Sequence, residues 1–125
     1  MSDETTSTVV QRFIAAFLER DPAAFVDLVA DDCVMETMQP APGGARYEGH
    51  DANVAFWQAM VLDRRGTFEV EDVWVAEDRA VNRWKYTFGA GKDQYVRGVT
   101  ILRVRDGKIA EALAYAKVPD TRLDG

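Results

Sequence analysis

The stretch of sequence that decides the fold reads RGVTILRVRDGKIAEALAY, from Arg97 to Tyr115. Apolar and polar residues alternate on both sides of Asp106-Gly107, a dipeptide that favours a tight two-residue turn. The pattern predicts a β-hairpin in which each residue can be assigned to one of two faces, because side chains alternate along a strand. We expect one of these faces to line a pocket.

Period-two alternation extends upstream of the hairpin and predicts further strands. Turn residues at Glu77-Asp78 and around residues 90–92 separate the alternating runs, so consecutive strands are expected to pair as an antiparallel meander. The predicted strands cover residues 68–75, 79–89, 95–105 and 108–118.

The N-terminal half shows helical periodicity instead. Apolar residues recur at helical spacing over residues 9–18 and predict a first helix, whereas the polar residues 1–6 are expected to be disordered. Asp21 before Pro22 is typical of a helix N-cap and predicts a short second helix. We expect that helix to end at Asp31 and Asp32.

A strand, a loop and a third helix follow in the predicted order. Residues 33–38 read as a short strand, and the proline and glycine residues of segment 40–44 indicate a loop. A short strand around Tyr47 comes next, and Asp51 is expected to cap a helix that ends near residue 64. Helices followed by an antiparallel sheet are the α+β pattern, which we assign to a single domain over residues 1–125.

Composition narrows the class of protein. The 125 residues are 47% hydrophobic, which is sufficient for a core without disulfides, and the single cysteine, Cys33, cannot form one internally. A net charge of -6 and a pI near 4.7 argue against nucleic acid and anionic membranes as partners. The sequence has neither a membrane-spanning run nor a signal-peptide pattern, so we expect a cytoplasmic protein.

The order of elements and three short passages resemble the nuclear-transport-factor-2-like superfamily. These passages are residues 30–36 (ADDCVME), residues 47–49 (YEG) and the hairpin turn at residues 106–109 (DGKI). The chain is most similar to the SnoaL-like, polyketide-cyclase-like branch, which also contains ketosteroid isomerases and limonene-epoxide hydrolases. The resemblance implies a cone-shaped α+β barrel, with three N-terminal helices packed in the concave face of a curved, mostly antiparallel sheet. It also implies a homodimer through the outer sheet face.

Several positions that carry chemistry in relatives hold other residues here. An isomerase-like alignment places Phe13, Thr37 and Thr100 where a tyrosine, a base aspartate and a second acid are expected. The position of the cyclase-like catalytic acid holds Ala114. Whether the protein is an enzyme therefore stays open, and this fold hosts both enzymes and binding modules.

The resemblance also implies a cup between sheet and helices, with a roomy floor. It places alanines at four successive inward positions of the last strand, residues 110, 112, 114 and 116. A cup of this kind is expected to be mostly apolar, with few polar groups. The candidate ligand-binding residues are Phe17, Trp57, Thr100, Ala112 and Ala114.

The candidate catalytic residues are Glu36, Arg83 and Lys85. In a hydrolase-like alignment Arg83 matches the family arginine, Lys85 replaces its paired aspartate, and both would point into the cup. Arginine can hold a carboxylate or developing negative charge, while Lys85 and Glu36 could exchange a proton. These residues suggest a small hydrophobic molecule that bears a carbonyl or carboxylate, and an isomerase-, cyclase- or hydrolase-like reaction without cofactor or metal.

Each of these assignments has an alternative. Simple amphipathicity would bury Trp84, Tyr86 and Phe88 and turn the two cations to solvent, unless a dimer interface covers those aromatic residues. Glu36 could equally be a solvated or arginine-paired carboxylate at a strand edge. The alternative function is a non-catalytic ligand-binding or dimerisation module.

Overall fold

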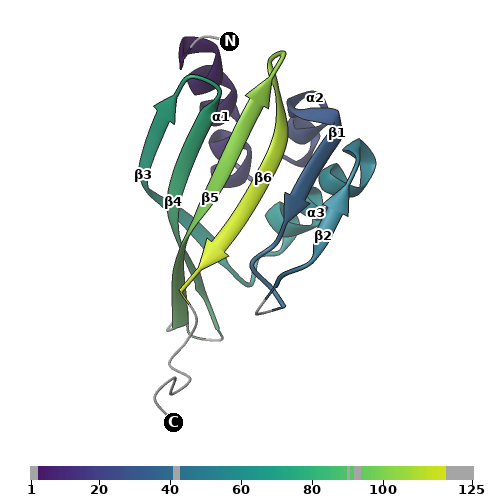
Figure 1. The fold of residues 1–125 in the computed structure, drawn as a ribbon. Helices are drawn as coiled ribbons and strands as arrows, with labels where there is room; N and C mark the ends of the chain where they lie inside the picture. The colour runs from purple at the N-terminus through teal and green to yellow at the C-terminus, as the bar shows by residue number, and fades with distance from the viewer. Residues whose placement is uncertain (1–2, 41–42, 90, 92–93, 118–125) are drawn as a thin grey trace.

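A computed structural model of the chain describes residues 3–40, 43–89, 91 and 94–117, in which helices cover one face of a sheet (Figure 1). The helical elements are α1 (Asp3–Leu18), the 3-10 turn η1 (Pro22–Ala24), α2 (Phe25–Leu28) and α3 (His50–Leu62). The strands are β1 (Val29–Glu36), β2 (Arg46–Glu48), β3 (Thr67–Ala76), β4 (Arg79–Phe88), β5 (Gln94–Arg105) and β6 (Lys108–Ala116).

The sheet has the strand order β2-β1-β6-β5-β4-β3. Strand β1 runs parallel to β6, and all other neighbours are antiparallel. The strands curve around α1 and α3, and β2 and β3 form the two edges (Figure 1). The predicted α+β cone is therefore confirmed, with the qualification that the sheet is open rather than closed into a barrel.

The hairpin of β5 and β6 forms as predicted. Asp106 and Gly107 both have positive φ, at 54° and 76°, as a two-residue turn with right-handed strand twist requires. The pairing register shifts between Arg103 and Val104, and both Ile109 and Ala110 beside this bulge are buried. Beyond the bulge, alternation resumes and places Ala112 and Ala114 on the helix-covered face.

The N-terminus differs from expectation. Residues 3–6, predicted to be disordered, form the first turn of α1, and residues 1–2 lie outside the described part. Thr6 is fully buried, and its Oγ1 donates a hydrogen bond of 2.5 Å to the carbonyl oxygen of Glu77. The contact is with a turn that lies 71 residues further along the chain, so the polar composition of the N-terminal segment does not predict it.

The predicted start of the first strand is also corrected. Asp21 does cap η1 by accepting a hydrogen bond from the Ala23 amide at 3.2 Å, but the following helix ends at Leu28. Strand β1 then begins at Val29, which pairs with Ile109 of β6. This parallel pairing draws residues 29–32 into the sheet, so their local helical pattern does not decide their structure.

The third helix is confirmed, with its N-cap two residues earlier than expected. Gly49, with φ at 95°, occupies the N-cap position, and Asp51 lies in the first turn. The predicted end of the last strand at residue 118 falls outside the described residues. In the parts of the chain that the structure describes, no helix is long and apolar enough to span a bilayer.

Candidate functional site

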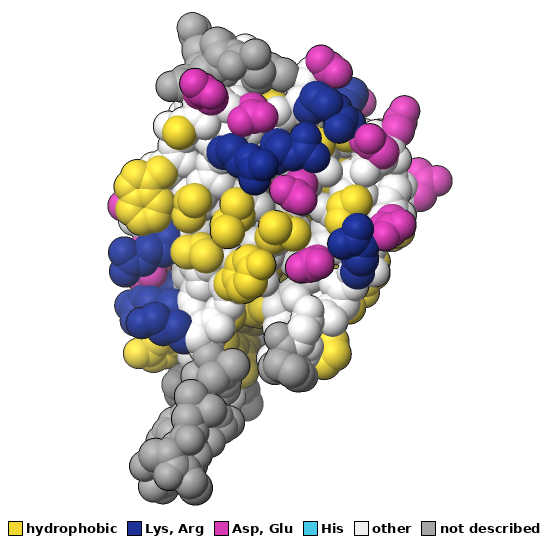
Figure 2. Space-filling model, viewed as in Figure 1, with side chains coloured by type: hydrophobic (Ala, Val, Ile, Leu, Met, Phe, Trp, Pro, Cys, Tyr) yellow, Lys and Arg dark blue, Asp and Glu magenta, His cyan; other side chains and the backbone are white. Residues whose placement is uncertain are grey.

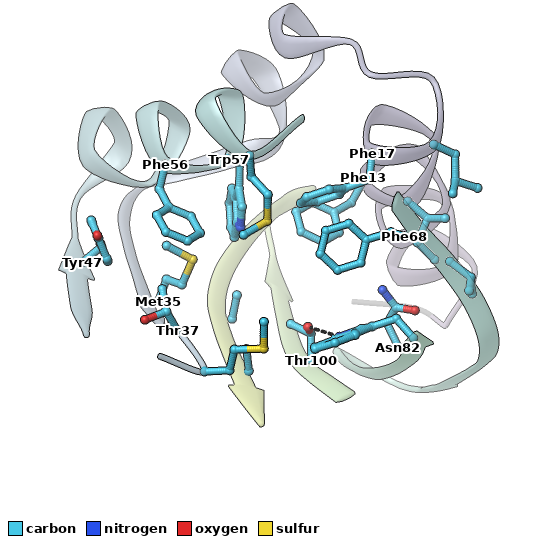
Figure 3. A pocket seen from close by; sticks show the side chains of 18 of the residues that line it. Phe13, Phe17, Met35, Thr37, Tyr47, Phe56, Trp57, Phe68, Asn82 and Thr100 are labelled. Atoms are coloured by element: carbon cyan, nitrogen blue, oxygen red, sulfur yellow. Dashed lines mark hydrogen bonds between the residues drawn. The ribbon is translucent and has the colours of Figure 1, made fainter. Parts of the chain in front are cut away.

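A cavity of about 300 Å³ lies between α1, α3 and the inner face of the sheet. Figure 3 shows the helices forming its roof and the strands its floor. This size lies at the lower end of the range for small-molecule sites in proteins. We call this cavity the cup.

Aromatic side chains make up the roof and one wall. The Phe13 ring lies edge-to-face against Trp57, with 4.9 Å between centroids, and Phe17 packs against Phe68 of β3 at 5.5 Å. Such pairs are mutually stabilising and hold the rings in fixed orientations. The six Phe and Trp side chains that line the cup are Phe13, Phe17, Phe56, Trp57, Phe68 and Trp84.

The floor consists of smaller side chains on neighbouring strands. Asn82 of β4 lies opposite Thr100 of β5, which in turn lies opposite Ala114 of β6. The alanines leave space because a methyl group extends little above the sheet. The five candidate ligand-binding residues all line the cup, namely Phe17, Trp57, Thr100, Ala112 and Ala114. That they bind a ligand stays a prediction.

Asn82 is a lining residue that sequence reasoning missed. Its side chain is 7% exposed, and its Oδ1 has no hydrogen-bond partner among the described residues. Beside it, Trp84 Nε1 donates a hydrogen bond of 2.9 Å to Thr100 Oγ1 (Figure 3). The sequence could have identified Asn82 if the inner face of β4 had been assigned correctly, because Asn82 is a polar residue between the inward-facing Ala80 and Trp84.

Arg83 and Lys85 do not line the cup, which corrects their predicted inward placement. Arg83 is half-exposed on the outer face of the sheet, with its Nε 3.9 Å from a carboxylate oxygen of Glu71. Lys85 Nζ lies on the same face, 4.6 Å from the centre of the Tyr95 ring. Of the two orientations considered above, the structure has the one that amphipathicity favours.

The neighbours of Arg83 and Lys85 that point inward are Trp84 and Tyr86. Trp84 is 5% exposed, and the Tyr86 ring packs against Phe68 with 4.6 Å between centroids. Gly98 lies directly opposite Trp84 on β5 and leaves room for the indole. A Cβ atom built on Gly98 would lie 2.6 Å from Trp84 Cη2, so a larger residue would exclude this packing. An inward Arg83 and Lys85 would have required Trp84 and Tyr86 on the outer face, covered by a dimer interface. The structure places both aromatic residues on the inner face instead.

Glu36 also lies outside the cup. Its carboxylate is 3.4 Å from Arg46 Nη1 of β2, and its side chain is 38% exposed. This is the arginine-paired alternative at a strand edge. The structure thus separates Glu36 from Lys85, and the proposed proton exchange between them has no geometric basis.

The cup has few groups for acid–base chemistry. Among the described residues, no Asp, Glu, His, Lys, Arg or Cys side chain lines it. Cys33 is buried nearby in β1, where desolvation raises the pKa of its thiol to about 12. In the described ranges, no three His, Cys, Asp or Glu side chains cluster as a metal site would require.

Comparison with known proteins extends these observations. The sequence model of the SnoaL-like domain matches residues 10–112, and no curated protein matches the chain. The crystal structure of an NTF2-like protein of unknown function from Mesorhizobium loti is 41% identical, with 93% of each chain covered and a TM-score of 0.88.

Two further solved structures share the fold at lower identity. A putative ketosteroid isomerase from Kribbella flavida is 20% identical, with 97% of this chain and 87% of that chain covered and a TM-score of 0.74. A putative polyketide cyclase from Sinorhizobium meliloti is 24% identical, with 86% and 93% covered and a TM-score of 0.70. At such identities the likeness concerns the fold alone.

Proposed function

Since this chain belongs to the SnoaL-like domain family, we propose that it binds a small, largely apolar molecule in its cup. The observation that carries the proposal is an apolar cavity of about 300 Å³ walled by aromatic rings. A well-packed domain rarely leaves so much apolar space unfilled, because each lost contact forfeits dispersion energy. A ligand that fills the space recovers that energy.

The lining favours binding over catalysis. An isomerase-, cyclase- or hydrolase-like reaction by proton transfer needs a base or acid within hydrogen-bond reach of the substrate. The described lining offers amide, hydroxyl and indole groups, which orient a ligand but exchange protons poorly at neutral pH. The outward placement of Arg83 and Lys85 also removes the cations on which the expectation of a carboxylate-bearing ligand rested.

Thermal unfolding in the presence of naphthalene-sized apolar probes tests the proposal. A probe that binds only the folded state, at about 100 times its Kd, stabilises that state by about 2.7 kcal/mol and raises Tm. Ala114→Phe places a phenyl ring in the cup and should abolish the shift. Ala55→Phe, which adds the same ring at an exposed position of α3, is the matched control and should retain it. Equal shifts in the two variants would contradict binding in the cup.

A specific observation favours a second role, that of a homodimer through the outer sheet face. Trp74, Val81, Ile101 and Leu113 form a continuous row across β3, β4, β5 and β6, since each lies opposite the next. Trp74 is 52% exposed, and Figure 2 shows apolar side chains gathered over this face. Exposed apolar patches of this kind mark interaction sites.

Charges of both signs surround the row, so we infer that its partner is a second copy of the chain. Arg79 and Arg103 flank Glu111 on one side of the row, and Arg83 and Arg97 flank Glu71 on the other side. A two-fold axis can bring basic groups of one copy to acidic groups of the other, because both occur within one patch.

Sedimentation over a range of concentrations tests the dimer. Ile101→Glu buries a charge at the centre of the row and should shift the protein to monomer. Gln11→Glu adds the same charge on the exposed side of α1 and should leave the assembly unchanged. A wild-type protein that remains monomeric at every concentration would overturn this second role.

A further inference from the structure

The outer face of the sheet carries basic residues side by side on three neighbouring strands. Lys85 of β4 lies directly opposite Arg97 of β5, and Lys117, just after β6, donates its backbone amide to the carbonyl oxygen of Arg97. Like charges at directly opposite positions destabilise a sheet, because their Cβ atoms are only about 5 Å apart. We call Lys85, Arg97, Lys117 and the nearby Arg83 the cation cluster.

A hollow of about 370 Å³ lies among these side chains. Arg83, Arg97 and Lys117 line it, together with Tyr115 and Val99. Figure 2 shows basic side chains gathered at the lower left of this face. Because Arg83 and Arg97 are half-exposed there, a solute can reach the hollow from the surface.

The acidic residues near the cluster lie to one side of the hollow. Glu71 of β3 is the one carboxylate among the described residues within 4.0 Å of the cluster, at 3.9 Å from Arg83 Nε and 3.1 Å from Arg97 Nε. Glu69 and Asp72 are also on β3, at the register positions opposite Lys85 and Arg83. In the described part of the chain, no Asp or Glu lines the hollow itself.

The arginines on the other side of the apolar row are balanced differently. Arg79 and Arg103 lie 3.7 and 3.9 Å from Glu111, and Arg105 is paired with Asp32. Each of those three cations therefore has a carboxylate within 4.0 Å, whereas Lys85 and Lys117 have none among the described residues. A chain with a net charge of -6 thus keeps a local excess of positive charge at the cation cluster.

We propose that the cation cluster binds an oxyanion, the phosphate or carboxylate group of a small molecule, in this hollow. Arg97 bonds to Glu71 through Nε alone, which leaves its two terminal amino groups available to an oxyanion. The planar guanidinium matches two oxygens of such a group, and the ammonium of Lys117 adds a further charge. A bound anion also relieves the repulsion between the neighbouring cations. The site is complete within one chain, so it depends neither on the cup nor on the dimer.

Titration with inorganic phosphate tests the inference, with backbone amide NMR as the readout and sodium chloride to hold the ionic strength constant. We expect saturable shifts at Arg97, Val99 and Lys117, at a pH of about 8 where phosphate is mostly a dianion. Acetate, with a single charge, should bind several-fold more weakly, and phenyl phosphate as tightly as phosphate. Tighter binding of acetate would identify the preferred group as a carboxylate. Shifts that do not saturate with any of the three anions would overturn the proposal.

Substitutions that remove one charge each locate the site. Arg97→Gln should weaken phosphate binding about tenfold and Lys117→Gln several-fold, because each loses a charge-assisted contact. Arg79→Gln is the matched control, since it removes an exposed arginine of the same face that already has a carboxylate partner. The control should bind phosphate within twofold of wild type. Equal weakening by all three substitutions would show an effect of net charge alone and refute the site.

Thermal unfolding supplies a second readout that a purely structural role would not give. Without phosphate, Lys117→Gln should have a Tm equal to or above that of wild type, because a like-charge repulsion is removed. Saturating phosphate should reverse the order, since it stabilises the wild-type protein more. A Lys117→Gln protein with a lower Tm under both conditions would contradict the proposal. If Arg97→Gln does not fold without its contact to Glu71, the Lys117→Gln measurements still decide the question.

Discussion

At the scale of single residues, Arg20 connects two helices through its side chain alone. It follows α1 with a positive φ of 53°, and its guanidinium donates to the carbonyl oxygens of Val61, Asp63 and Gly66 at 3.0, 3.1 and 2.7 Å. The last carbonyls of a helix lack partners within the helix. Arg20 thus closes the end of α3 and positions the helix that forms the roof of the cup.

We expect Arg20→Met to lower the free energy of unfolding by about 2–4 kcal/mol, because three charge-assisted hydrogen bonds are lost. Arg20→Lys should retain only part of the free energy of unfolding that Arg20→Met loses, since an ammonium group cannot reproduce the forked donor geometry of a guanidinium. Urea denaturation measures both. Arg12→Met, which removes an exposed cation from α1, is the control, and an equal effect there would contradict the role of Arg20.

Cys33 should be inert in the folded protein. It is fully buried in β1, and desolvation raises the pKa of its thiol from 9.0 to about 12. A thiol reagent at pH 8 should therefore react only as fast as the protein unfolds, with a rate that rises with urea. Rapid labelling without denaturant would contradict the burial.

The same shift predicts a pH dependence. The unfolded thiol ionises near pH 9, whereas the folded thiol stays protonated until about pH 12. The stability associated with the raised pKa is complete below pH 9 and is lost as the pH rises towards 12. The free energy of unfolding of wild-type protein should therefore fall more steeply over this window than that of Cys33→Ala, as measured by urea titrations at successive pH values.

At the scale of elements, the pairing of β4 with β5 decides what enters the cup. Trp84 fits on the inner face because Gly98, opposite it, has no side chain. Alternation then places Asn82 on the same inner face and Arg83 and Lys85 on the outer one. A single glycine on β5 therefore determines both the aromatic wall and the position of the polar floor.

Gly98→Ala should be destabilising by about 1–3 kcal/mol, because the new methyl group would overlap the Trp84 ring and the carbonyl oxygen of Tyr115. The displaced indole would also lose its hydrogen bond to Thr100, so Trp fluorescence should change. Gly43→Ala is the control, since a Cβ there meets no atom within 4 Å. Similar Tm values for the two variants would show that β5 tolerates the substitution.

At the scale of the whole molecule, the sheet separates the two surfaces for which we propose different roles. The inner face and the helices enclose the cup, and the outer face carries the apolar row and its charges (Figures 2 and 3). Side chains of adjacent residues on one strand reach opposite surfaces, as Leu113 and Ala114 do. The two proposed functions can therefore be altered independently.

We expect Ile101→Glu to abolish dimer formation and leave probe binding in the cup within about twofold of wild type. Ala114→Phe should do the opposite, by filling the cup without changing the sedimentation behaviour. A variant that lost both properties together would indicate that the cup and the outer face are coupled, and would contradict this separation.

Much of the architecture follows from local pattern. Local sequence is sufficient to predict features that depend on residues close along the chain. These are the capping role of Asp21, the turn at Asp106-Gly107 and the strand character of β3 to β6. The burial of Thr6 and the early start of β1 do not. Both depend on partners from distant segments, Glu77 and Ile109, that no local pattern identifies.

The sequence by itself determined the α+β order of elements and the sets of residues that share a face, because period-two alternation is a property of the strand. Only the tertiary structure decided which set faces the helices. On β4 the choice lay between Arg83 with Lys85 and Asn82 with Trp84, and it was made by Gly98 and by the apolar helices opposite, which favour burial of an indole over two cations. Shifting the inward-facing set of β4 by one residue exchanges a cationic cup for an apolar one. Arg83 and Lys85, predicted to be catalytic, then become surface charges.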